Sequence, residues 1–195
     1  MSVDHRSEAA RIAPVGYRQG GLLVRLAYRE SRRRYGAVLD PMRVMAHRPG
    51  LLAGAAAIEL AAERSRTLSR RLKHLAELRA GMICGCEWCL DFGSAISPEM
   101  GVDDNDLRAL PAYEVNGHFD ELEKLVLDYA TAMSRSPVEV SDELFAALKA
   151  RLDDRQLVEL TNIIALENYR ARFNWAVGLG PQGFSEGAVC LAPSS

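Results

Sequence analysis

Two cysteines three residues apart are the residues of this chain best suited to chemistry. They form the motif Cys86-Glu87-Trp88-Cys89, which follows Gly85 directly. A first thiolate at this spacing can attack an oxidant, and the second thiol, one helical turn away, can resolve the product as a disulfide. A thiol at a helix N-terminus ionises more easily, because the helix dipole and the unpaired backbone N–H groups favour the thiolate. The motif therefore predicts redox chemistry.

A metal site and simple packing are the two other interpretations of the cysteines. Cys84 extends the motif to CxCxxC, and three thiolates could bind zinc with Cys190 or His74 as the fourth ligand. Structural zinc sites usually combine two separated ligand pairs, and the sequence has no second CxxC and no HxxxH. We therefore predict no metal and no cofactor, and we expect Cys84 to pack against apolar side chains.

Helices are expected to position the two thiols. One apolar stripe with helical spacing leads to the motif, and it consists of Leu68, Leu72, Leu75, Leu78 and Met82. This helix is expected to end at Gly85. The next helix is expected from Cys86 to about Ser97, because Pro98 breaks it. Both cysteines then lie in or beside the first turn of the second helix.

Other segments carry the same helical period or helix-capping signals. Further helices are expected over 21–35, from Asp40-Pro41 onward, and over 51–63, 122–133, 141–152 and 153–175. The sequence has no fixed-period repeat. The predicted fold is an all-α helical bundle with a single domain over 1–195 and a core at about 41–178. The ends, 1–19 and 182–195, are expected to be loosely structured.

The composition is that of an ordinary globular protein. Of the 195 residues, 48% are hydrophobic and 26% are charged, and the formal net charge is −2. This balance gives no reason to expect a nucleic-acid or membrane partner. No apolar stretch approaches the ~20 residues of a transmembrane helix, and the first twenty residues show no secretory signal. We therefore expect a cytoplasmic protein.

The run from Leu72 to Gly93, LKHLAELRAGMICGCEWCLDFG, resembles the core of the carboxymuconolactone decarboxylase superfamily, in particular its alkylhydroperoxidase-D-like branch. The stretches 41–60 and 141–178 are similar to the family's approach and closing helices. The resemblance implies an all-helical fold that assembles into homo-oligomers, commonly dimers, trimers or hexamers. It also implies a cysteine pair that reduces hydroperoxides or exchanges a disulfide with a partner, with a dithiol or lipoyl-type electron donor.

The resemblance implies separate roles for the two thiols. Cys89 would react with the peroxide, and Cys86 would resolve the product. Family members also use a glutamate twelve residues before the first cysteine and a histidine four residues after the second as a proton relay. In this chain His74 and Gly93 stand at those two positions, so the usual relay is replaced.

Four side chains could take over the proton transfer, which needs a titratable group near the thiol. His74 has an unperturbed pKa of about 6.5 and could be the base, although a partly exposed helix position explains it equally well. Asp91 lies in the first turns of the second helix, where capping or surface placement is the competing role. Glu77 and Glu167 are further acids, and a salt bridge from Glu167 to an arginine explains that residue equally well.

The leading hypothesis is a thiol-dependent oxidoreductase or peroxidase of the alkylhydroperoxidase type. One alternative is a lactone decarboxylase-like enzyme of the same superfamily, against which the retained CxxC argues. The other alternative is a non-catalytic oligomeric binding protein, which the replaced relay residues would suit.

Overall fold

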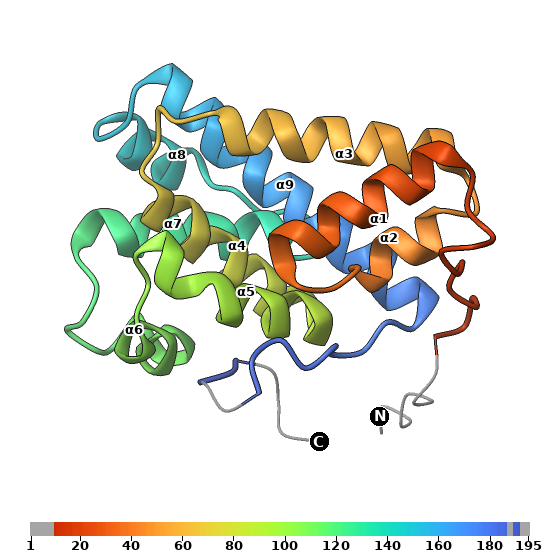
Figure 1. Cartoon of the computed structure of the whole chain (residues 1–195). Helices are drawn as coiled ribbons and strands as arrows, with labels where there is room; N and C mark the ends of the chain where they lie inside the picture. The colour runs from red at the N-terminus through yellow and green to blue at the C-terminus, as the bar shows by residue number, and fades with distance from the viewer. Residues whose placement is uncertain (1–9, 187–188, 192–195) are drawn as a thin grey trace. The chain divides into compact units, whose positions relative to one another are not determined.

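The computed structural model describes residues 10–186 and 189–191 (Figure 1). Over these residues the chain forms nine α-helices and one 3-10 helix, with no strand, which confirms the all-α prediction. None of the described helices is long and apolar enough to cross a membrane. The expected loose ends fall partly on 1–9, 187–188 and 192–195, which lie outside the described residues.

The described chain divides into two compact units. The first contains the residues up to Arg64 together with Asn174–Gly180. Its helices are α1 (Leu22–Tyr35), α2 (Asp40–Met45) and α3 (Pro49–Arg64). Its core cluster consists of Val24, Tyr28, Val38, Ala46 and Leu52. The Tyr28 hydroxyl donates a hydrogen bond of 2.9 Å to the carbonyl of Val15, so the buried phenol is satisfied within this unit.

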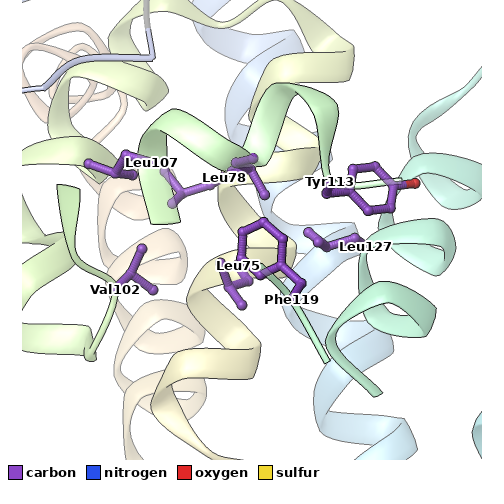
Figure 2. Close-up of a cluster of buried hydrophobic side chains, with 8 residues drawn as sticks. Leu75, Leu78, Val102, Leu107, Tyr113, Phe119 and Leu127 are labelled. Carbon is purple, nitrogen blue, oxygen red and sulfur yellow. The ribbon is translucent and has the colours of Figure 1, made fainter. Parts of the chain in front are cut away.

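The second unit contains Ser65–Phe173 and the described residues from Pro181 onward. Its helices are α4 (Arg70–Cys84), α5 (Glu87–Met100), α6 (Asp104–Ala109), the 3-10 helix η1 (Leu110–Ala112), α7 (Glu121–Ser134), α8 (Asp142–Lys149) and α9 (Asp154–Val177, to Phe173 in this unit). Helix α4 packs against α5 and α7. Figure 2 shows the buried cluster beside α4, in which Leu75 and Leu78 meet Tyr113, Phe119 and Leu127. The predicted apolar stripe of α4 therefore faces a core.

A tight turn joins α4 to α5. Gly85 has a φ of 66°, a left-handed conformation that glycine adopts without steric cost. The N–H of Cys86 donates to the carbonyl of Gly81 at 3.0 Å, which closes the end of α4. Cys86 is itself the N-cap of α5. The predicted helix–turn–helix junction is thus confirmed.

Two helix boundaries differ from the sequence prediction. Helix α5 continues through Pro98 to Met100 and ends at Gly101, whose φ is 81°. Proline lacks the N–H of a helical hydrogen bond, but this costs little in the last turn, where Gly101 caps the end. The short helix α6 was not expected. Asp103 caps it by accepting hydrogen bonds from two backbone N–H groups.

Helix α9 begins as the sequence indicates. Asp153 and Gln156 exchange backbone-to-side-chain hydrogen bonds of 2.9 and 3.0 Å, the reciprocal arrangement of a capping box. Lys73 of α4 forms an ion pair of 2.6 Å with Glu159 of α9, and both side chains are buried. This pair fixes the register of α9 along α4.

Candidate functional site

The two cysteines of the motif form a disulfide at the start of α5. The Cα atoms of Cys86 and Cys89 lie 5.2 Å apart. The sulfur of Cys86, the N-cap residue, accepts a hydrogen bond of 3.2 Å from the N–H of Cys89. Both sulfurs therefore lie in the field of the helix N-terminus, which favours a thiolate when the pair is reduced.

The two thiol positions differ in exposure. Cys86 is only 2% exposed, whereas Cys89 is half-buried. A dissolved substrate thus reaches Cys89 more easily than Cys86. This asymmetry agrees with the expected roles, in which Cys89 attacks and Cys86 resolves.

The two positions of the family relay face each other across α4 and α5. His74 is 2% exposed, so the expectation of a partly exposed histidine is wrong. Its Nε2 lies 3.1 Å from the carbonyl oxygen of Gly93 and 2.9 Å from the hydroxyl of Ser97. A Cβ on Gly93 would lie 2.9 Å from a methyl carbon of Leu78 and 4.0 Å from the imidazole. The chain thus has a histidine at one relay position and, at the other, a glycine where a side chain would require Leu78 to move.

His74 is connected to an acid one turn further along α4. Its Nδ1 lies 3.7 Å from Oε2 of Glu77. The other oxygen of Glu77 accepts a hydrogen bond of 2.8 Å from Arg170 of α9. Burial raises the pKa of Glu77, but His74 and Arg170 lower it more, and the pKa lies below its ordinary value. Glu77 is therefore a carboxylate at neutral pH.

Arg170 also contacts the second acid of the site. Its guanidinium lies 2.9 Å from Oε2 of Glu167, which is 5% exposed. Oε1 of Glu167 lies 3.4 Å from the position that a Cβ on Gly81 would take, and the Cβ of Cys89 lies 3.7 Å from the same point. Glu167 thus reaches the neighbourhood of Cys89, and the expected salt bridge to an arginine is also present.

Asp91 has a different role from the one considered in the sequence. It is 2% exposed, so surface placement is wrong. Its carboxylate accepts hydrogen bonds from the N–H groups of Gln182, Phe184 and Ser185 and from the Ser185 hydroxyl, at 2.7 to 3.1 Å. Burial raises the pKa of Asp91, but these hydrogen bonds lower it more, below the ordinary value. Asp91 therefore holds the segment after Pro181 onto α5.

Aromatic side chains from the same two segments pack beside the motif. The rings of Trp88 and Phe92 stack at 5.3 Å between centroids, and Phe184 meets Phe92 edge-on at 5.3 Å. The indole N–H of Trp88 donates to the side-chain oxygen of Gln182 at 3.2 Å. Trp88, one of the two residues between the cysteines, is thus held by the segment that follows α9.

Cys84 lies apart from the disulfide pair. Its thiol is half-buried and donates to the side-chain oxygen of Asn168 at 3.4 Å. Burial raises the pKa of this thiol and so does Glu167, while Arg172 lowers it less, and the net pKa lies above its ordinary value. Cys84 is therefore a weaker nucleophile at neutral pH than an ordinary thiol.

One other cluster offers donor atoms for a metal. Atoms of Asp103, Asp106 and His118 lie within 4.8 Å of one another. Asp106 also pairs with Arg71, whose guanidinium donates to one oxygen at 2.8 Å. Burial raises the pKa of Asp106, but Arg71 and further hydrogen bonds lower it to about 2. The cluster is an ion-pair network in which the guanidinium of Arg71 takes the place of a metal ion.

Sequence reasoning missed the connection through Arg170 and the role of Gly81. The only local signal was Gly81 itself, a glycine inside a helix that otherwise has strong helix formers. Glu167 and Cys89 both lie beside Gly81, and the imidazole of His74 contacts the carbonyl of Gly93. They place Asp91 in the attachment of the later segment.

Comparison with known proteins agrees with this fold. Residues 49–132 match the model of the carboxymuconolactone decarboxylase family. The uncharacterized protein YnjA of Escherichia coli (strain K12) is 35% identical over 153 residues, which covers 78% of this chain and 84% of YnjA.

Two solved structures share the fold at low sequence identity. An alkylhydroperoxidase AhpD core from Ralstonia eutropha JMP134, described as an uncharacterized peroxidase-related protein, has a TM-score of 0.81 at 18% identity, with 94% of this chain and 99% of that chain covered. The debrominase Bmp8 has a TM-score of 0.80 at 20% identity, with 91% and 96% covered. A cysteine-to-alanine variant of Bmp8 has been solved with 2,3,4-tribromopyrrole. The chain therefore belongs to the carboxymuconolactone decarboxylase family and has the fold of an alkylhydroperoxidase AhpD core.

Proposed function

We propose that this protein is a thiol-dependent oxidoreductase that reduces hydroperoxides through Cys86 and Cys89. The observation that carries the proposal is the disulfide between a buried and a half-buried cysteine at the N-terminus of α5. A helix N-terminus stabilises a thiolate, and a thiolate is the form that attacks an O–O bond.

The proposed reaction has three balanced steps. The sulfur of Cys89 attacks one peroxide oxygen, which gives a sulfenic acid and releases an alcohol. The thiol of Cys86 then displaces water from that sulfenic acid and forms the disulfide. An external dithiol reduces the disulfide by exchange and becomes a disulfide itself. Exchange with a disulfide-bearing partner uses the same two sulfurs in the reverse direction.

Peroxide consumption tests this proposal. The reduced protein is mixed with tert-butyl hydroperoxide and excess dithiol, and the residual peroxide is measured over time. We expect Cys89→Ser to abolish turnover. Cys86→Ser should turn over more slowly than the unmodified protein, because the external dithiol must then reduce the sulfenic acid on Cys89 itself. Cys190→Ser is the matched control, since Cys190 is a half-buried cysteine outside the motif that forms no disulfide. Full turnover in Cys89→Ser would refute the role of this thiol, and no turnover in the unmodified protein would leave the binding-protein or decarboxylase alternative.

A brominated substrate belongs in the same test. The fold neighbour Bmp8 is a debrominase that has been solved with 2,3,4-tribromopyrrole. Bromide release from this compound by the reduced protein, lost in Cys89→Ser, would place the same thiol pair in reductive dehalogenation instead of peroxide reduction.

We also propose that the protein forms homo-oligomers through α3. This helix is apolar on several sides, with Leu51, Ile58 and Leu60 exposed by 67%, 51% and 44%. A helix that is apolar around most of its circumference is normally buried, and a second copy of the chain would cover it.

A further inference from the structure

Reduction of a hydroperoxide by a thiol moves one proton as well as two electrons. The proton leaves the attacking sulfur, and the departing oxygen must receive one to become an alcohol. A side chain that carries this proton must lie close to the sulfur. His74 does not meet this need directly, since its contacts are with Ser97, Gly93 and Glu77.

We propose that Glu167 carries the proton of Cys89, an inference that rests on the proposed thiol chemistry. Its Oε1 and the Cβ of Cys89 flank the same point beside Gly81, at 3.4 and 3.7 Å. The side chain is 5% exposed and comes from α9, whereas the family's relay residues come from α4 and α5. A Cβ at position 81 would thus lie within contact distance of both groups, and 3.4 Å from a methyl carbon of Leu90.

The packing of α4 on α9 sets this geometry. Lys73 pairs with Glu159 at 2.6 Å, and both Gly81 and Glu167 follow eight residues later on their helices. Eight residues are slightly more than two helical turns, so Gly81 and Glu167 lie on nearly the same faces of their helices as Lys73 and Glu159. Gly81 therefore faces Glu167 across the two helices. The register that the buried ion pair fixes therefore brings Glu167 to Gly81.

The helices that carry Glu167 and Cys89, and the helix α4 beside them, bear further titratable side chains. The groups on α4 are His74, Glu77 and Cys84, those on α9 are Arg170 and Arg172, and those on α5 are Cys86, Glu87 and Asp91. Arg170 pairs with Oε2 of Glu167 at 2.9 Å and with Glu77 at 2.8 Å. It holds the carboxylate in place and leaves Oε1 on the side of Gly81 and Cys89.

The proton transfer through Glu167 accompanies the two-electron oxidation of the Cys89 sulfur. Oε1 of Glu167 accepts the S–H proton of Cys89 as the sulfur bonds to the peroxide oxygen. The O–O bond breaks, and the same proton passes to the departing oxygen, which leaves as an alcohol. Sulfur is oxidised by two electrons to the sulfenic acid, the peroxide is reduced, and Glu167 returns to the carboxylate.

Glu167→Gln separates proton transfer from other roles, because two reactions of Cys89 respond in opposite directions. Alkylation by iodoacetamide needs only the thiolate. Removal of a neighbouring negative charge favours the thiolate, so alkylation at pH 7 should become faster. Peroxide reduction also needs a proton donor for the departing oxygen. The rate constant for oxidation by tert-butyl hydroperoxide should therefore fall by about 10²- to 10⁴-fold at pH 7.

Two further variants test whether the effect is specific to Glu167 and to its position beside Gly81. Glu99→Gln is the matched control, since it removes an exposed carboxylate from the other end of α5, ten residues after Cys89, and leaves Glu167 in place; it should leave the peroxide rate constant unchanged. Gly81→Ala places a methyl group at ordinary contact distances from Oε1 of Glu167, the Cβ of Cys89 and a methyl carbon of Leu90. The variant should fold normally, and peroxide oxidation should slow by about 10-fold or more while alkylation continues.

Each outcome decides a separate claim. If Cys89→Ser still reduces peroxide, the proposed function itself fails. If Cys89→Ser is inactive but Glu167→Gln speeds or slows both reactions alike, or changes neither, the proposed function stands and the role of Glu167 is refuted. Slower oxidation with faster alkylation supports the inference.

Discussion

Substitution of Asp91 by asparagine should release the segment after Pro181 from α5. The two carboxylate oxygens of Asp91 accept two hydrogen bonds each, from Gln182 and Phe184 on one oxygen and from the N–H and hydroxyl of Ser185 on the other. In the asparagine variant one oxygen becomes an NH₂ group, which cannot accept a hydrogen bond and faces two donors.

The size of the effect follows from these contacts. A hydrogen bond to a charged group contributes about 1.5 to 3 kcal/mol, and the partly exposed members of this set lie at the low end. Loss of two such bonds therefore costs about 3 kcal/mol, which corresponds to roughly a hundredfold increase in the opening of the segment.

Hydrogen exchange measured by mass spectrometry tests this prediction. Backbone amides in 182–185 should exchange about a hundredfold faster in Asp91→Asn than in the unmodified protein. Ser94→Ala is the control, because it removes only the hydrogen bond from the N–H of Leu191 at 3.2 Å. Unchanged exchange over 182–185 in Asp91→Asn would refute the assignment of Asp91 to this attachment.

Three further predictions concern stability, the relay position and assembly. Because folding lowers the pKa of Asp106 to about 2, its ionised form should stabilise the protein above pH ~4 by about 2 kcal/mol, and this contribution should disappear as the pH falls from 4 to 2. Urea unfolding at several pH values should show this loss, and Asp106→Asn should flatten it. Gly93→His should destabilise the protein by about 1 to 3 kcal/mol, because the new Cβ meets Leu78 at 2.9 Å; a melting temperature equal to that of the unmodified protein would contradict this. Ile58→Glu with Leu51→Glu should reduce the mass measured by light scattering to that of a monomer, and a monomeric unmodified protein would refute assembly through α3.

The local sequence predicted the elements that hold the thiols. The apolar stripe of α4, the stop at Gly85 and the start of α5 at the CxxC depend on residues within one or two turns of each other, so their periodicity and capping signals suffice. The extension of α5 through Pro98 was not predicted, because the effect of the proline depends on the cap that Gly101 provides.

The contacts around the thiols could not be predicted in the same way. Asp91 is 91 to 94 residues from its partners, and Glu167 reaches Gly81 only through the register of α9 on α4. Such pairings depend on helix packing, which the pattern of a single segment does not specify. The burial of His74 has the same origin, since Gly93 and Ser97 of α5 enclose it.

The reaction of Cys89 with peroxide is tested most directly in Cys86→Ser, where a sulfenic acid on Cys89 has no resolving thiol in the motif. The reduced variant is treated with one equivalent of tert-butyl hydroperoxide and trapped with dimedone, and the adducts are located by peptide mass spectrometry. We predict a single adduct on Cys89. An adduct only on Cys84 or Cys190, or no adduct under conditions that consume peroxide, would contradict the assignment of Cys89 as the reactive thiol.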